Sequence, residues 1–204
     1  MFIFDLDGTL IDSNGIWDNI DQQFLNRHKL PFSQEYHDGV AHIILQNAAA
    51  FTKTFFNMQE SPEDIIAEWM ELASDAYNHV QLRPYAKKYL DQCKAMSIRM
   101  AVFTSCVPEH CDAAMRHLGL NEYFEQVIYA QNIGMEKHSP KTFTEVARIL
   151  DVKPCDCVLI DDSPTNCIAA KSAGMKTLCI FDPKRKADYE RNKTPTCTFE
   201  ELVI

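Results

Sequence analysis

The chain has 204 residues, 46% of them hydrophobic, which suffices for one α/β core or for a core with a small second domain. Its 29 acidic and 20 basic residues give a net charge of −9, which disfavours a nucleic-acid partner held through its phosphates. No apolar run approaches the roughly 20 residues of a membrane span and no signal core opens the sequence, so we expect a cytoplasmic protein without a membrane partner.

A short apolar run from Phe2 to Phe4 predicts a buried strand, and two aspartates, Asp5 and Asp7, follow it in the motif D-L-D-G-T. The alternation of side chains along a strand places both carboxylates on one face, close enough to share a metal ion or to divide the roles of nucleophile and acid/base. The structural alternative is an Asp-rich turn in which Gly8 supplies an unusual backbone angle and Thr9 caps the next element.

The next segment contains only helical patterns, which predicts a helical insert after the first strand. Apolar residues at helical spacing mark helices at Ile16 to Leu25, Val40 to Ala50 and Pro62 to Tyr77. The last of these begins with a cap serine, Ser61, followed by a proline and acidic residues. We place the boundaries so that residues 1–12 and 83–204 form the core domain and residues 13–82 form a helical cap domain.

Strand and helix patterns alternate in the rest of the chain. Further strands are expected at Ile98 to Phe103, Val127 to Tyr129, Cys157 to Ile160 and Thr177 to Phe181. Helices are expected at Tyr85 to Met96, Pro108 to Leu118, Thr142 to Leu150 and Thr165 to Ala173, and the tail from Lys184 to Phe199 is expected to be irregular. This alternation predicts an α/β fold, a Rossmann-like parallel sheet between two layers of helices.

Polar residues follow two of the predicted strands and precede one of the predicted helices. Thr104 and Ser105 end the second strand, where a hydroxyl and main-chain N–H groups would face an oxyanion. Lys137 precedes a helix, and Asp161 and Asp162 end the fourth strand. Taken singly, a Thr-Ser pair is also a common helix cap and a single lysine is usually solvated. A helix cap explains one acid after the fourth strand, but it does not need two.

This set of motifs, in this order and spacing, resembles the haloacid dehalogenase-like hydrolase superfamily. The resemblance runs from Phe2 to about Phe181, and its first and last motifs are highly specific. The helical insert resembles the cap of the phosphoglycolate phosphatase and β-phosphoglucomutase branch. Such a cap closes over the site and excludes water.

The resemblance implies a role for each motif residue. Asp5 would be the nucleophile that takes the phosphoryl group, and Asp7 would be the general acid/base. Thr104 would hydrogen-bond the transferring phosphoryl group, and Lys137 would stabilise the charge of the nucleophile and the phosphate. A small phosphorylated metabolite is the implied partner.

The resemblance also implies Mg²⁺ as the cofactor. Asp162 would be a direct ligand and Asp161 a ligand through water, while Asp5 would contribute its side chain and Asp7 its main-chain carbonyl. Magnesium prefers oxygen ligands and keeps several waters, which suits so few donors.

Five residues are candidates for substrate contacts. Gly8, Thr9 and Ser105 come from the core motifs, and Asn14 and Lys53 come from the predicted cap. Asn14 lies near the first hinge and Lys53 in the middle of the insert. For the two cap residues, the alternative is a solvated polar side chain.

Three positions depart from the family pattern. His138 stands where proline usually follows the lysine, Tyr85 stands where glycine commonly follows Pro84, and Asn166 replaces an acid or glycine late in the last motif. The loss of an acid at Asn166 would weaken Mg²⁺ affinity without abolishing the site.

We therefore predict Mg²⁺-dependent hydrolysis of a small phosphate monoester through an aspartyl-phosphate. Two alternatives stay open: a phosphomutase of the β-phosphoglucomutase type, which shares every core residue, and a non-catalytic module that binds a phosphate ligand. Dehalogenation and phosphonate cleavage are disfavoured, because the members of the superfamily that catalyse them lack the second Asp of the motif, here Asp7. The sequence does not decide the substrate or whether the protein is a monomer or a dimer.

Overall fold

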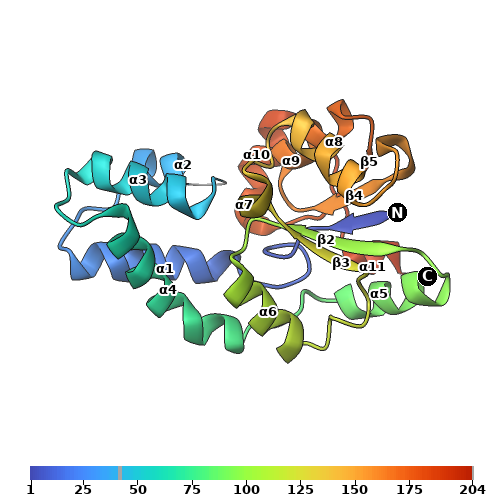
Figure 1. Ribbon diagram of the computed structural model, residues 1–204, viewed down its shortest axis with the longest axis horizontal. Helices are drawn as coiled ribbons and strands as arrows, with labels where there is room; N and C mark the ends of the chain where they lie inside the picture. The colour runs from blue at the N-terminus through green and yellow to red at the C-terminus, as the bar shows by residue number, and fades with distance from the viewer. Residues whose placement is uncertain (41–42, 204) are drawn as a thin grey trace.

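The computed structural model describes residues 1–40 and 43–203 and contains a sheet of five parallel strands in the order β3-β2-β1-β4-β5 (Figure 1). The strands are β1 (Phe2–Phe4), β2 (Met100–Thr104), β3 (Gln126–Tyr129), β4 (Val158–Asp161) and β5 (Lys176–Cys179). The predicted α/β class with a parallel sheet is confirmed. The central strand β1 pairs with both β2 and β4, so the order in which strands are added to the sheet reverses at β1, the strand that Asp5 follows.

Helices cover both faces of this sheet, as the alternating pattern predicted. Apart from the insert, they are α5 (Ala86–Ala95), α6 (Pro108–His117), α7 (Ala130–Ile133), α8 (Pro140–Ile149), α9 (Pro164–Ser172), α10 (Lys186–Asn192) and α11 (Phe199–Leu202), with 3-10 turns η1 (Pro154–Asp156) and η2 (Pro183–Arg185). Helices α5 and α6 lie on one side of the sheet, and α8 and α9 lie on the other (Figure 1). The molecule's core therefore has three layers.

Side chains along each strand point alternately to the two faces of the sheet, which gives two apolar clusters, one on each face. Phe4 and Ile160 belong to the apolar cluster that includes residues of α5 and α6, whereas Ile3 and Leu159 belong to the cluster that includes residues of α8 and α9. Adjacent residues of one strand thus face opposite layers, and both are buried. Near-continuous apolar runs were the signal that revealed these strands.

The insert consists of α1 (Asn14–Arg27), α2 (Gln34–Val40), α3 (Leu45–Phe56) and α4 (Pro62–Asn78). The start of α4 is as predicted, because Ser61 and Asp64 form a reciprocal capping box. The helix predicted at Val40 to Ala50 is wrong: α2 ends at Val40 and α3 begins at Leu45, and residues 41–42 lie outside the described part. The extended backbone of Ile44, with ψ 151°, fixes the start of α3.

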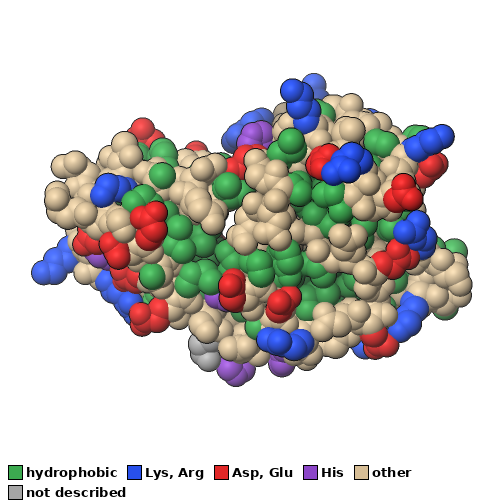
Figure 2. Space-filling model, in the orientation of Figure 1, with side chains coloured by type: hydrophobic (Ala, Val, Ile, Leu, Met, Phe, Trp, Pro, Cys, Tyr) green, Lys and Arg blue, Asp and Glu red, His purple; other side chains and the backbone are tan. Residues whose placement is uncertain are grey.

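The insert contacts the core on two sides. Its two linkers pair with each other, since the N–H of Asp12 donates to the carbonyl of Gln81 at 2.9 Å and the N–H of Arg83 donates to the carbonyl of Leu10 at 2.9 Å. On the opposite side, the carboxylate of core residue Glu136 accepts from the main-chain N–H of Ile44. Figure 2 shows an indentation between the insert and the core above this junction.

Two further differences from the sequence-based expectations lie outside the sheet. The tail after Lys184 is not irregular but forms η2 and α10, because buried Tyr189 anchors it: the hydroxyl accepts from the N–H of Asp182 at 2.9 Å. A single apolar anchor among charged residues leaves too little periodicity to predict. Tyr85 has φ 62°, in the left-handed region that favours glycine, which explains why the family commonly has glycine there.

No helix in residues 1–40 and 43–203 has the length and apolar character needed to span a bilayer.

Candidate active site

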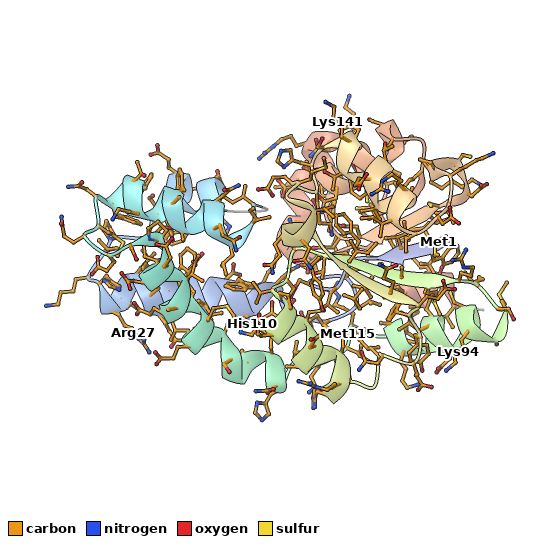
Figure 3. The ribbon with its side chains drawn as sticks, in the orientation of Figure 1. Met1, Arg27, Lys94, His110, Met115 and Lys141 are labelled. Carbon is orange, nitrogen blue, oxygen red and sulfur yellow. The ribbon has the colours of Figure 1, made fainter. Side chains whose placement is uncertain are left out.

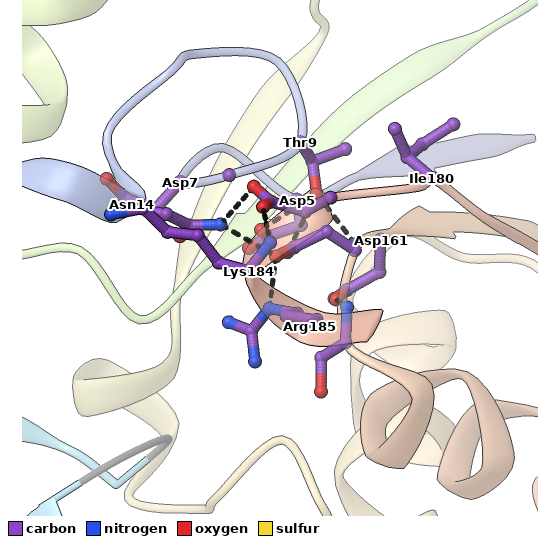
Figure 4. A network of polar contacts seen from close by, with 12 residues as sticks. Asp5, Asp7, Thr9, Asn14, Asp161, Ile180, Lys184 and Arg185 are labelled. Atoms are coloured by element: carbon purple, nitrogen blue, oxygen red, sulfur yellow. Dashed lines mark hydrogen bonds and ion pairs between the residues drawn. The ribbon is translucent and has the colours of Figure 1, made fainter. Parts of the chain in front are cut away.

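The carboxyl ends of β1, β2 and β4 bring the predicted motifs together (Figure 4). Asp5 directly follows β1, Thr104 is the last residue of β2 and Asp161 is the last residue of β4. Parallel strands in register end at the same edge of a sheet, and ligands of open α/β folds bind at this edge, where the strand order reverses. All three side chains are buried.

Lys137 joins the first and last motifs. Its Nζ lies 2.6 Å from Oδ1 of Asp5 and 2.9 Å from Oδ2 of Asp161, and it donates to the carbonyl of Phe103 at 3.1 Å. The lysine side chain is only 4% exposed, so three charged groups share a nearly dry environment. The lysine predicted to stabilise the nucleophile is thus in contact with it.

Burial dominates the electrostatics of this group. It raises the pKa of Asp5 well above its ordinary value; Lys137 opposes this shift, and the carboxylates of Asp161 and Asp162 add to it. For Lys137 burial acts to lower the pKa, but Asp161 and Asp5 outweigh it, so the pKa of the lysine is raised. The lysine therefore stays positively charged beside Asp5.

Asp162 lies next to this group, and Thr9 links it to Asp5. The hydroxyl of Thr9 is 3.2 Å from Oδ2 of Asp5 and 3.2 Å from Oδ1 of Asp162, and it accepts from the N–H of Asp162 at 2.9 Å. Burial raises the pKa of Asp162, Arg185 opposes the shift and Asp161 adds to it.

Three carboxylates, Asp5, Asp161 and Asp162, each offer an oxygen, and these oxygens lie within 4.8 Å of one another. All three residues are buried, and Lys137 alone does not balance their charge. Oxygen donors and an excess of negative charge fit a hard divalent cation. Among the described residues, the side chain of Asp7 is not part of this cluster.

Asn166 orients one of these carboxylates. Its side-chain amide lies 3.1–3.2 Å from both oxygens of Asp161, whose Oδ1 also accepts from the N–H of Ser163 at 2.8 Å. The residue that departs from the family pattern thus supplies hydrogen bonds in place of a charge. Its expected effect on Mg²⁺ affinity stays a prediction.

The carboxylate of Asp7 faces the insert instead of Asp5. Its Oδ1 accepts from the hydroxyl of Ser13 at 2.6 Å and from the hydroxyl of Tyr77 at 2.6 Å. Tyr77, from α4, in turn accepts from the indole N–H of Trp17 at 2.7 Å, and its ring stacks on His110 of α6 at a centroid distance of 4.8 Å. Figure 3 shows His110 where α6 meets the insert. Sequence reasoning missed this network, because Tyr77 fits the apolar pattern of its helix.

The other core motif residues line the same edge. Thr104 is buried, and its hydroxyl accepts from the N–H of Cys106 at 2.9 Å, while Ser105 is half-buried beside it. Gly8 has φ 75°, and a Cβ there would lie 2.3 Å from the side-chain amide of Asn14. The glycine is therefore required by its backbone and by the close approach of Asn14.

The structure brings one of the two predicted insert contacts to the site. The amide of Asn14 donates to Asp162 at 3.1 Å and to Asp182 at 2.8 Å. Lys53, on α3, instead contacts the loop before α4, where its ammonium donates to the carbonyl of Glu60 at 2.6 Å.

The segment after β5 adds charged residues that the sequence did not single out. Asp182 is buried and accepts from Arg83 at 2.8 Å, and Arg185 donates to Asp162. Burial acts to raise the pKa of Asp182, but hydrogen bonds from the Lys184 N–H, Asn14 and Arg83 outweigh it and leave that pKa below its usual value. A run of basic residues in a charged tail gives no sequence signal for such contacts.

The known proteins to which this chain is similar include phosphatases and a phosphomutase. The chain is 23% identical over 87% of its length to a bifunctional riboflavin kinase/FMN phosphatase from Arabidopsis thaliana, of which it spans 47%. It is 23% identical over 99% of its length to phosphoglycolate phosphatase 1 from Pseudomonas aeruginosa, covering 76% of that protein. The crystal structure of β-phosphoglucomutase from Clostridium difficile superposes with a TM-score of 0.81 at 19% identity, covering 98% of this chain and 92% of that one. The last likeness establishes the fold.

The model of the haloacid dehalogenase-like hydrolase family matches residues 2–180, which include all five strands of the sheet, the insert and every motif residue of the site. The membership predicted from the motifs is thereby confirmed: the chain belongs to the haloacid dehalogenase-like hydrolases and is an enzyme of that family.

Proposed function

We propose that this hydrolase is a Mg²⁺-dependent phosphatase that cleaves a small phosphate monoester through an aspartyl-phosphate on Asp5. The observation that carries the proposal is the buried cluster of Asp5, Asp161 and Asp162 with Lys137 held 2.6 Å from Asp5. Phosphoryl transfer requires a positioned nucleophile and positive charge around the phosphoryl oxygens. The phosphatase names of the similar proteins support the same reaction class.

The residues of this chain divide the chemistry. An oxygen of Asp5 forms a bond to phosphorus as the bond to the leaving oxygen breaks, and Asp7 gives that oxygen a proton. Asp7 then takes a proton from the water that attacks the aspartyl-phosphate. The N–H groups and hydroxyls near Thr104 and Ser105 hydrogen-bond the phosphoryl oxygens.

Mg²⁺ would be held by the carboxylates of Asp5 and Asp162, the main-chain carbonyl of Asp7 and, through water, Asp161, and it would neutralise charge on the phosphoryl group. Lys137 supplies the fixed positive charge on the other side of Asp5. Together they let a protein with a net charge of −9 accept an anionic substrate.

Residues 13–82 act as the cap domain in this proposal, and residues 1–12 and 83–204 act as the catalytic core. The substrate is a small phosphorylated metabolite of the cytoplasm. Gly8, Thr9 and Ser105 contact its phosphate, and Asn14 contacts the rest of the molecule when the cap closes, whereas Lys53, bound to the loop before α4, takes no part in this proposal.

The test is phosphate release from a panel of small phosphate esters, including sugar phosphates, phosphoglycolate and FMN, with Mg²⁺ and with EDTA. We expect metal-dependent release from at least one ester. Isomerisation of a sugar phosphate without phosphate release would replace the proposal by the mutase, and binding without turnover of any ester would replace it by the binding module.

Asp7→Asn is expected to separate the two half-reactions. The amide cannot activate water, so turnover should fall by about 10²–10⁴-fold. With p-nitrophenyl phosphate, whose leaving group needs little protonation, a burst of nitrophenolate equal to the enzyme concentration should precede the slow phase. Rapid-mixing absorbance measures the burst. Wild-type turnover in this variant would remove Asp7 from the acid/base role.

Tyr77→Phe is expected to disturb Asp7 without changing the shape of the site. Phenylalanine keeps the ring against His110 and deletes the hydroxyl that donates to Asp7 at 2.6 Å. A hydrogen bond to a charged group is worth about 1.5–3 kcal/mol, so kcat should fall by about tenfold or more while KM stays nearly constant. Steady-state kinetics on the best ester measures both. An unchanged kcat would show that Tyr77 only fills space.

A further inference from the structure

Arg185, at the end of η2, lies directly against a predicted metal ligand. Its Nε donates to Oδ2 of Asp162 at 2.5 Å, and its side chain is only 16% exposed. Figure 4 shows Arg185 beside the group that contains Asp5, Thr9 and Asp161. A buried cation is thus in place at the carboxylate that is proposed to bind Mg²⁺.

Both carboxylate oxygens of Asp162 have hydrogen-bond partners. Oδ2 accepts from Asn14 at 3.1 Å in addition to Arg185, and Oδ1 lies 3.2 Å from the hydroxyl of Thr9. A carboxylate has about four lone-pair positions, so these donors take most of its capacity. A cation that coordinates Asp162 must share it with Arg185 or displace it.

Charge makes the two cations competitors. The site contains the buried carboxylates of Asp5, Asp161 and Asp162, and Lys137 contacts the first two. Arg185 is the cation on the third, and like charges at such short distance repel strongly in a buried site.

We propose that Arg185 competes with the divalent cation for the Asp162 carboxylate and thereby lowers the affinity of the site for that cation. The inference rests on the proposed function, because it requires Asp162 to be a metal ligand. As a consequence of this competition, the fraction of enzyme molecules that hold Mg²⁺ follows the free Mg²⁺ concentration, and the metal is not bound permanently. Arg185 is in this sense an affinity-setting residue, distinct from the groups that touch the substrate.

Direct binding of Mn²⁺ to the whole protein, followed by the electron paramagnetic resonance signal of the free ion, tests the proposal without any assay of activity. We expect Arg185→Gln to bind Mn²⁺ at least about fivefold more tightly than the wild type, as for an ordinary coupling between two ligands of one site. Asp162→Asn should bind much more weakly than either.

A matched control is Lys184→Gln, which removes the same charge one residue earlier. Lys184 pairs with the exposed carboxylate of Asp18 at 2.6 Å, where solvent and salt screen it. Its Mn²⁺ affinity should therefore stay within about twofold of the wild type. Equal tightening in both variants would assign the effect to net charge and overturn the role of Arg185.

Thermal unfolding gives a second measurement. Arg185→Gln should melt at a lower temperature than the wild type in EDTA and should gain more from saturating Mn²⁺. If this variant fails to fold, Arg185→Met replaces it: methionine keeps part of the length of the side chain but carries no charge, so its Mn²⁺ affinity should also exceed that of the wild type.

The outcomes distinguish a failure of the competition by Arg185 from a failure of the proposed metal site at Asp162. Mn²⁺ affinity that is unchanged or weaker in folded Arg185→Gln or Arg185→Met, with binding still lost in Asp162→Asn, overturns the competition and leaves the metal site standing. Mn²⁺ binding that does not depend on Asp162 overturns the proposed metal site and the competition with it.

Discussion

Asp5→Asn is expected to abolish turnover, with a loss of at least about 10³-fold in kcat on every ester that the wild type hydrolyses. The amide is nearly isosteric with the carboxylate but cannot form the acyl phosphate. Lys137 keeps its second partner, Asp161, at 2.9 Å, so the site is expected to remain folded. Phosphate release and acid-quench detection of the phosphoenzyme measure the effect.

The same variant should change the pH dependence of stability. Burial raises the pKa of Asp5 in the folded state, so the folded protein binds a proton more tightly than the unfolded chain. The wild type therefore loses stability as pH rises from the unfolded pKa of about 3.9 through the raised folded value. Asp5→Asn removes this loss, so its free energy of unfolding relative to the wild type should be higher at pH 7 than at pH 4.

Asp18→Asn is the control for both measurements. It makes the same chemical change at a carboxylate that is about half exposed and paired with Lys184. We expect wild-type turnover and a stability change within about 0.5 kcal/mol. Turnover retained in Asp5→Asn would rule out the covalent route.

Lys137→Met is expected to have the largest effect on stability. Methionine has a similar length, but it leaves the carboxylates of Asp5 and Asp161 buried without their shared cation. Removing one partner of a buried ion pair costs about 3–5 kcal/mol, and we expect the free energy of unfolding to fall by that amount at pH 7. Urea unfolding measures it, and kcat should fall as well because positive charge beside the nucleophile is lost.

A double-mutant cycle tests the cause. In Lys137→Met, adding Asp5→Asn removes one of the two uncompensated carboxylates, so the second change should restore about 1–3 kcal/mol. Strictly additive effects would show that Lys137 stabilises the fold through packing on Phe103 and not through charge. Lys141→Met, at an exposed position in the first turn of α8, should change stability by less than about 0.5 kcal/mol.

Much of the fold was predictable because it follows from local patterns. Apolar runs such as Phe2–Phe4 and Val158–Asp161 are typical of strands buried on both faces. Ser61 marks the start of α4, because it forms a complete capping box there. The position of Asp5 and Asp161 at one edge then follows from parallel pairing.

What the sequence did not reveal depends on contacts between distant segments. Tyr77 has the pattern of a core aromatic, and only the meeting of α4 with the core turns its hydroxyl toward Asp7. Arg185 lies in a charged tail whose path is set by the burial of Tyr189. The break between α2 and α3 was missed because Glu136, far away in sequence, binds the main chain at Ile44.

The contacts between the insert and the core constrain how the insert can move. The two linkers run side by side and are joined by a bridge between Ile11 and Leu82. Glu136 binds the main chain at Ile44 on one side of the insert, and Tyr77 binds the carboxylate of Asp7 on the other. A movement of α4 away from the core would therefore break the hydrogen bond between Tyr77 and Asp7. The position of the insert and the environment of the Asp7 carboxylate are thus coupled.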